Sequence, residues 1–143
     1  MLFRSPTPLP ATTPKAGAPI PVTAWRVPIL MYHLITAPVP SYALEGLVVS
    51  PTLFDAQMRA LKDAGWTTIT AARLTADLTA GRKPAPRTVV VTFDDCYADG
   101  WQNAMPILQR YGFVGTFYII TDRVDIAPFL TSDMVRKLHA GGM

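Results

Sequence analysis

Short apolar runs alternate with longer segments of helical periodicity along most of the chain. The apolar runs are rich in β-branched and aromatic residues and are bounded by glycine, proline or polar residues, a pattern that predicts strands. The predicted strands span residues 27–32, 66–69, 89–93 and 115–120. The first and third of these runs are apolar enough for strands buried in a parallel sheet, with both faces of the third covered.

The segments between these runs predict four helices. Each begins at a residue whose side chain can cap a helix, and each is followed by a glycine near its end. The predicted helices span residues 51–64, 71–80, 103–111 and 131–139. Ser50, Thr70, Asn103 and either Thr131 or Ser132 are the expected caps, and Leu74 and Leu78 are expected on the inner face of the second helix. Strand–helix alternation of this kind predicts an α/β fold with parallel βα units.

Residues 1–26 differ from the rest of the chain in composition. They contain six prolines and three basic residues but no acidic residue. This composition predicts an extended linker or tail, or equally a disordered terminus without a role. The folded domain is therefore expected to span residues 27–143, where ten basic residues balance ten acidic ones. That balance argues against a nucleic-acid partner.

Three further features bound the class of protein. Cys96 is the only cysteine, which excludes an internal disulfide and a zinc site built from cysteines. No apolar stretch approaches the roughly 18–20 residues of a membrane-spanning helix. The amino terminus shows no apolar signal-peptide core.

The most informative feature is the pair Asp94 and Asp95, which directly follows the predicted strand 89–93. Chemistry in α/β folds is placed at the carboxyl ends of the strands. Two adjacent carboxylates repel each other unless a cation or a shared proton relieves the repulsion. One could bind a metal while the other removes a proton from water, so a metal-assisted hydrolytic site is the first hypothesis. The alternative is that both residues only form the turn or cap the next helix.

The other candidate residues give weaker evidence for a catalytic or binding role. Cys96 could act as a nucleophile only with a paired base, for which His33 is the one candidate, so a small buried residue is the better interpretation. His139 lies in the last turn of a predicted helix, where the helix dipole favours a cation. Asp99 is interpreted as a loop acid in preference to a partner of the site.

The segment at residues 92–97 resembles a family motif. It reads T-F-D-D-C-Y and resembles the first motif of the polysaccharide deacetylases, the NodB-like carbohydrate esterases, which is written T-F-D-D-G-[YFP]. Flanking segments resemble the same family in the same order, at residues 28–33, 49–58, 103–113 and 116–118. The opening strand is similar to that of the branch acting on poly-N-acetylglucosamine-like polymers. The resemblance covers residues 27–143.

This resemblance implies the first half of a deformed (β/α) barrel that removes N-acetyl groups from an N-acetylglucosamine polymer or from peptidoglycan. It implies that Asp94 is the general base and that Asp95 binds a divalent metal, commonly zinc. His33 and Tyr97 are expected to contact the polysaccharide substrate. The substrate class implies an extracellular or cell-envelope location.

The chain departs from the family pattern in two ways. Cys96 stands where the motif has glycine, so a turn with positive φ would be strained here. The family completes its metal site with two histidines on a later H-x-x-x-H motif, which these 143 residues do not contain. We therefore expect the N-terminal part of a deacetylase domain that, alone, neither holds zinc firmly nor deacetylates.

Two other functions stay open at this point. A non-catalytic glycan-binding or remnant protein would keep the groove without the metal, and the reading frame beyond Met143 separates it from the enzyme. A phospho-receiver domain also uses an acidic pair after a strand. There the pair follows the first strand, whereas here it follows the third predicted strand.

Overall fold

The computed structural model describes residues 25–143, so the predicted linker at residues 1–26 lies almost entirely outside the described part. Its strands are β1 (Ile29–Tyr32), β2 (Leu34–Ile35), β3 (Val48–Val49), β4 (Thr67–Thr68), β5 (Thr88–Phe93) and β6 (Thr116–Phe117). Its helices are α1 (Pro51–Asp63), α2 (Ala71–Thr79), α3 (Met105–Arg110) and α4 (Ser132–Ala140), with short helical turns η1 (Glu45–Leu47), η2 (Gly100–Ala104) and η3 (Thr121–Arg123). The predicted α/β class and the order of βα units are confirmed.

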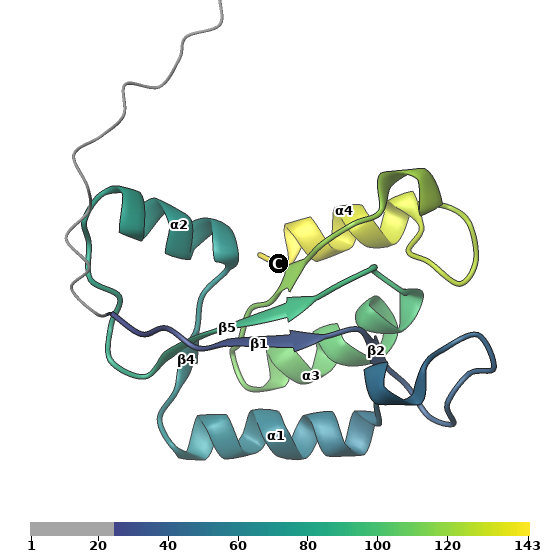
Figure 1. Cartoon of the computed structure of the whole chain (residues 1–143), viewed down its shortest axis with the longest axis horizontal. Coiled ribbons are helices and arrows are strands. Elements are labelled where there is room, and N and C mark those ends of the chain that lie inside the picture. Colours follow the sequence, from purple (N-terminus) through teal and green to yellow (C-terminus); the bar gives the residue numbers. More distant parts are fainter. Residues whose placement is uncertain (1–24) are drawn as a thin grey trace, which may run out of the picture.

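Strand β5 is the centre of a parallel sheet. β1 pairs along one of its edges, while β4 pairs with residues 88–89 and β6 with residues 92–93 on the other. The arrows of β1 and β5 point to the same side of the molecule in Figure 1, with α1 and α3 on one side of these strands and α2 and α4 on the other. The carboxyl ends of the strands therefore meet at one edge, where a site is expected.

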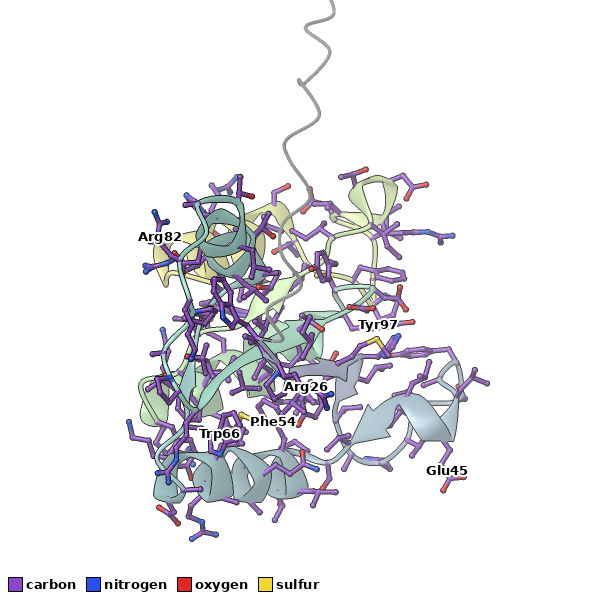
Figure 2. The ribbon with its side chains drawn as sticks, turned by 60° about the vertical axis from the view of Figure 1, so that its left-hand side comes forward. Arg26, Glu45, Phe54, Trp66, Arg82 and Tyr97 are labelled. Atoms are coloured by element: carbon purple, nitrogen blue, oxygen red, sulfur yellow. The ribbon has the colours of Figure 1, made fainter. Side chains whose placement is uncertain are left out.

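Aromatic rings fill the core between the sheet and α1. All six residues of β5 are buried, as predicted. The Phe93 ring stacks on Phe117 with 4.5 Å between ring centroids, and it lies 5.8 Å from both Tyr32 and Phe54. Phe54 projects from α1 toward the sheet in Figure 2. This packing fixes the carboxyl end of β5 relative to β1, β6 and α1.

Strand β1 was predicted to be buried, but the structure shows that it is only half buried. The side chains of Ile29 and Met31 are 58% and 62% exposed, whereas Leu30 and Tyr32 are partly buried. The Tyr32 hydroxyl donates a hydrogen bond of 2.9 Å to Gln57 on α1. Within residues 25–143 β1 pairs only with β5, so it is an edge strand with one face against the helices. An apolar run alone does not distinguish such a strand from a central one.

Helix α2 also differs from the prediction. Leu74 is partly buried, but Leu78 is 38% exposed, and the buried residue of the helix is Asp77. Its carboxylate accepts hydrogen bonds from Arg73 at 2.7 Å and from Arg82 at 2.9 Å. These hydrogen bonds hold the pKa of Asp77 below its usual value. A buried charge is tolerated when it is paired in this way.

Three of the four predicted helix caps are confirmed. The side chains of Ser50, Thr70 and Thr131 each accept a hydrogen bond from the backbone N–H three residues later, at 3.2, 3.2 and 3.3 Å. Each satisfies a backbone donor that has no partner within its helix.

The prediction that Asn103 caps a helix is wrong. Helical structure already begins before it, and Asn103 lies inside the π-helical turn η2. Its side chain instead donates a hydrogen bond of 2.8 Å to the carbonyl oxygen of Ile35, the last residue of β2. Strands β2 and β3, which pair in parallel, were not predicted.

The ring cluster predicts a large difference between two neighbouring positions on α1. Replacing Phe54, which is fully buried, by alanine should lower the free energy of unfolding by about 3–5 kcal/mol because a cavity is left among the rings. Leu53→Ala is the control, since Leu53 is 52% exposed and its replacement should change stability by less than about 1 kcal/mol. Urea unfolding followed by circular dichroism measures both values. Equal losses for the two variants would contradict this packing.

Candidate active site

The acidic pair lies in a tight turn at the carboxyl end of β5. The backbone N–H of Asp94 donates a hydrogen bond of 2.8 Å to the carbonyl oxygen of Tyr32, which extends the pairing with β1 by one residue. The next two residues, Asp95 and Cys96, have φ angles of 63° and 47°. Residues in this left-handed region reverse the chain direction. Aspartate adopts it more readily than most residues, whereas cysteine adopts it at a cost.

Both carboxylates are partly exposed and are not used to form the turn. Among residues 25–143, neither Asp94 nor Asp95 takes part in an ion pair or a side-chain hydrogen bond. Asp95 contributes to the turn through its backbone, but neither carboxylate accepts a backbone N–H within residues 25–143, as a capping side chain would. The geometry therefore leaves both carboxylates available to a ligand.

Cys96 is a buried part of the turn. Its side chain is 3% exposed and packs against Met105, Leu130 and Leu138. Burial, and to a smaller extent the negative charges of Asp94 and Asp95, raise the pKa of the Cys96 thiol to about 12. A thiol with this pKa is not a nucleophile at neutral pH, so the predicted role as a small buried residue is confirmed. Its φ of 47° shows that the turn does need positive φ, so the expected strain is present.

His33 stands at the same edge of the sheet as the acidic pair, because it follows β1 as Asp94 follows β5. Tyr32 pairs with Phe93 in the β1–β5 register, so the next residues in register are His33 and Asp94. The His33 side chain is partly buried. The second histidine, His139, is exposed in the last turn of α4.

Asp99 has a structural role that the sequence interpretation missed. Its carboxylate accepts a hydrogen bond from the backbone N–H of Ile35, while Asn103 one helical turn later donates to the carbonyl of the same residue. Burial raises the pKa of Asp99. One helix thus holds both backbone polar groups of Ile35 and fixes β2 beside the acidic turn. The spacing of the two polar residues is a signal, but their partner lies 64 and 68 residues away in the sequence.

Tyr97 lies at the same edge of the molecule. It is partly buried, and its pKa is raised by burial and then by the nearby groups Asp95, Tyr42 and Asp99. Figure 2 places Tyr97 on the side of the molecule away from Arg82 and Trp66, which precede the strands. The structure therefore brings the predicted residues of the site to the carboxyl ends of the strands.

Cavities are found at both ends of the sheet. One of about 200 Å³ lies beside the acidic turn and is lined by Thr36, Tyr42, Ala98, Asp99, Gln102 and Pro128. Two larger ones, of about 260 and 340 Å³, lie at the amino ends of β4 and β5 around residues 82–88. The one acid in these larger cavities, Asp77, is already paired with two arginines. The smaller cavity is therefore the better candidate for ligand binding.

The described residues do not complete a metal site. Asp94 and Asp95 offer oxygen ligands, which suit divalent cations. However, no group of three or more His, Cys, Asp or Glu side chains within residues 25–143 converges to hold a metal ion. Nor is any helix of this part of the chain long and apolar enough to cross a membrane.

Comparison with known proteins gives a consistent result. A family model described as polysaccharide deacetylase matches residues 81–143. YxkH of Bacillus subtilis, assigned as a polysaccharide deacetylase, is 33% identical over 118 residues, which are 82% of this chain and 40% of that protein. The Streptococcus pyogenes deacetylase PplD, solved in complex with acetate, is 34% identical with a TM-score of 0.73, over 82% of this chain and 53% of PplD. BA0330 of Bacillus anthracis, also assigned as a polysaccharide deacetylase, is 34% identical with a TM-score of 0.71, over 81% of this chain and 36% of BA0330.

A parallel sheet with two carboxylates at the carboxyl end of its central strand defines an α/β domain with a candidate hydrolytic site. By its motif, its fold and its relatives, the chain is similar to the polysaccharide deacetylases over most of its length, and the predicted resemblance is confirmed. The chain spans about half or less of the length of the relatives it matches.

The environment of Cys96 predicts a protected thiol. With a pKa of about 12, roughly one thiol in ten thousand is ionised near pH 8, and the side chain is also inaccessible. Ellman's reagent should therefore react with the native chain far more slowly than with the chain unfolded in guanidinium, which is the control. Equal rates in the two states would show that the turn is open and that Cys96 is not held as described.

Proposed function

We propose that this chain supplies the acidic part of a metal-dependent active site that removes N-acetyl groups from an N-acetylglucosamine polymer or from peptidoglycan. The observation that carries this proposal is the position of Asp94 and Asp95 at the carboxyl end of the buried strand β5, where neither carboxylate has an ion-pair or side-chain hydrogen-bond partner within residues 25–143. Similarity to the polysaccharide deacetylases supports hydrolysis of a C–N bond. The structure of PplD contains acetate, which is the acid product of such a reaction.

In this proposal Asp94 is the general base. It takes a proton from the water molecule whose oxygen attacks the carbonyl carbon of the N-acetyl group. The C–N bond then breaks, acetate leaves, and the amine of the sugar takes up a proton. Asp94 directly follows Phe93, the last residue of β5, and its backbone is fixed by the hydrogen bond to Tyr32. General bases need to be held at hydrogen-bond distance from the proton they remove.

Asp95 is proposed as one ligand of a divalent metal, commonly zinc in this family. Tight zinc sites use three or four protein ligands. Because residues 25–143 contain no group of three, the remaining ligands must come from another part of a complete domain. His33 and Tyr97 lie at the same edge of the sheet and are proposed to contact the polysaccharide. An extracellular or cell-envelope location follows from this substrate.

The first prediction of this proposal concerns the chain of 143 residues by itself. It should bind zinc with a dissociation constant weaker than about 1 μM, since one or two carboxylates do not form a tight site. It should also release no acetate from an N-acetylglucosamine oligomer. Isothermal titration calorimetry and an acetate assay measure these properties. Sub-micromolar zinc binding together with turnover would show that this chain holds a complete site.

The second prediction tests the roles of the acidic pair in a complete domain. In a chimera, residues 27–143 would replace the region of PplD that they match. The chimera should release acetate when zinc is bound. Asp94→Asn should lower kcat/KM by roughly 10²–10⁴-fold with zinc still bound, because the general base is lost. Asp95→Asn should instead remove the bound zinc, which atomic absorption measures.

Asp63→Asn is the matched control for the chimera. Asp63 is an exposed aspartate at the end of α1 and belongs to no part of the acidic turn. Its replacement should leave both zinc content and kcat/KM unchanged. If Asp94→Asn behaved like this control, Asp94 would not be the base.

A further inference from the structure

Three aromatic rings form a stack beside the acidic turn. Tyr97 lies in the middle, with Tyr42 on one side at 6.1 Å between ring centroids and Phe129 on the other at 5.0 Å. The interplanar angles to the Tyr97 ring are 21° for Tyr42 and 20° for Phe129, so both rings stack on Tyr97. The rings come from three separate segments of the chain, and we call them the aromatic stack.

The backbone fixes the position of the aromatic stack. Tyr97 and Phe129 form an antiparallel bridge, and the residues next to them exchange backbone hydrogen bonds of 2.9 and 3.1 Å. The stack is therefore attached directly to the turn that carries Asp94 and Asp95. In Figure 1 the blue loop before η1, which carries Tyr42, lies on the side to which β1 and β5 point, as does the yellow-green loop before α4.

The two ends of the aromatic stack differ. At one end the guanidinium of Arg123 lies over the Phe129 ring, 5.7 Å from its centroid. Because Tyr97 covers one face of Phe129, Arg123 occupies the other, a favourable cation–π position. At the opposite end Tyr42 is 58% exposed. The ring face available to a ligand is therefore that of Tyr42.

Polar groups surround this exposed ring. Tyr42 lines the cavity of about 200 Å³ together with Thr36 and Gln102, whose side chains can donate and accept hydrogen bonds. Asp99 also lines the cavity, and the Asp95 carboxylate is close enough to raise the pKa of Tyr97. An aromatic face with hydrogen-bonding groups and acids around it suits a neutral polyhydroxylated ring and disfavours a phosphate-bearing ligand.

From this arrangement we propose that Tyr42 and the cavity beside it form a subsite for one pyranose ring of the polysaccharide. The C–H groups on one face of the sugar lie against the electron-rich face of Tyr42, while Thr36 and Gln102 bind its hydroxyl or acetamido groups. This inference rests on the proposed function for the identity of the polymer. The sugar bound at this subsite would be a different unit of the same polymer from the one that Asp94 and Asp95 would act on.

The test measures binding by the 143-residue chain without any need for turnover. An N-acetylglucosamine pentamer is titrated into the labelled protein, and backbone amide shifts are followed by NMR. We expect the largest shifts at residues 36, 42, 97 and 102. Tyr42→Ala should raise the dissociation constant about fivefold because the stacking face is lost, whereas Tyr42→Phe should change it less than about twofold.

Leu44→Ala is the matched control, because Leu44 is 73% exposed and lies two residues from Tyr42 on the same loop. It should bind the pentamer as the parent chain does. Amide shifts outside the loop, unchanged in all variants, show that each one is folded. Failure of the chain to bind the pentamer, or equal affinities for Tyr42→Ala and the parent, would overturn the subsite.

The outcomes separate this inference from the proposed function. If Tyr42→Ala binds normally while Asp94→Asn inactivates the chimera with PplD, the subsite is wrong and the function stands. If binding depends on Tyr42 but the chimera loaded with zinc releases no acetate, the function is wrong and the glycan subsite stands.

Discussion

Strand β5 is paired on both edges and buried along its whole length, and this burial determines where the chain can place charge. Six consecutive buried residues leave no room for a carboxylate until the strand ends. The first position beyond the ring cluster around Phe93 is Asp94, whose backbone is still held by β1. The packing of the rings around Phe93 therefore fixes the position of the acidic pair at the edge of the sheet.

The turn after β5 is held from both sides. Cys96 packs into a small cluster with Leu130 and Leu138, and the bridge between Tyr97 and Phe129 continues that contact. On the other side, Asp99 and the amide of Asn103 bind the backbone of β2. These contacts offset the cost of two consecutive residues with positive φ. Strain of this kind is stored where the surrounding structure fixes a functional geometry.

Local signals in the sequence predicted the parts of the structure that depend on neighbouring residues. The caps Ser50, Thr70 and Thr131 act within one helical turn, and the apolar run of β5 is continuous. The acidic pair was recognisable because charge follows that run directly. These features, together with the family motif, were sufficient for the fold class and for the place of the candidate site.

The features that sequence reasoning missed depend on contacts between distant segments. The edge position of β1 follows from its pairing, which periodicity does not encode. Asn103 serves the backbone of Ile35 and not its own helix, and Asp77 is buried because two arginines reach it. The aromatic stack joins three loops. No spacing rule connects Tyr42 with Tyr97 and Phe129, since their arrangement depends on the folded sheet.

The proposed site depends on Asp95 binding a divalent cation beside Asp94 at the carboxyl end of β5. Paramagnetic broadening of amide signals by trace Mn²⁺ tests it most directly, because the effect falls steeply with distance and detects weak binding. We expect the broadening to centre on residues 93–97 and to disappear in Asp95→Asn. Broadening centred elsewhere, or unchanged in that variant, would contradict it.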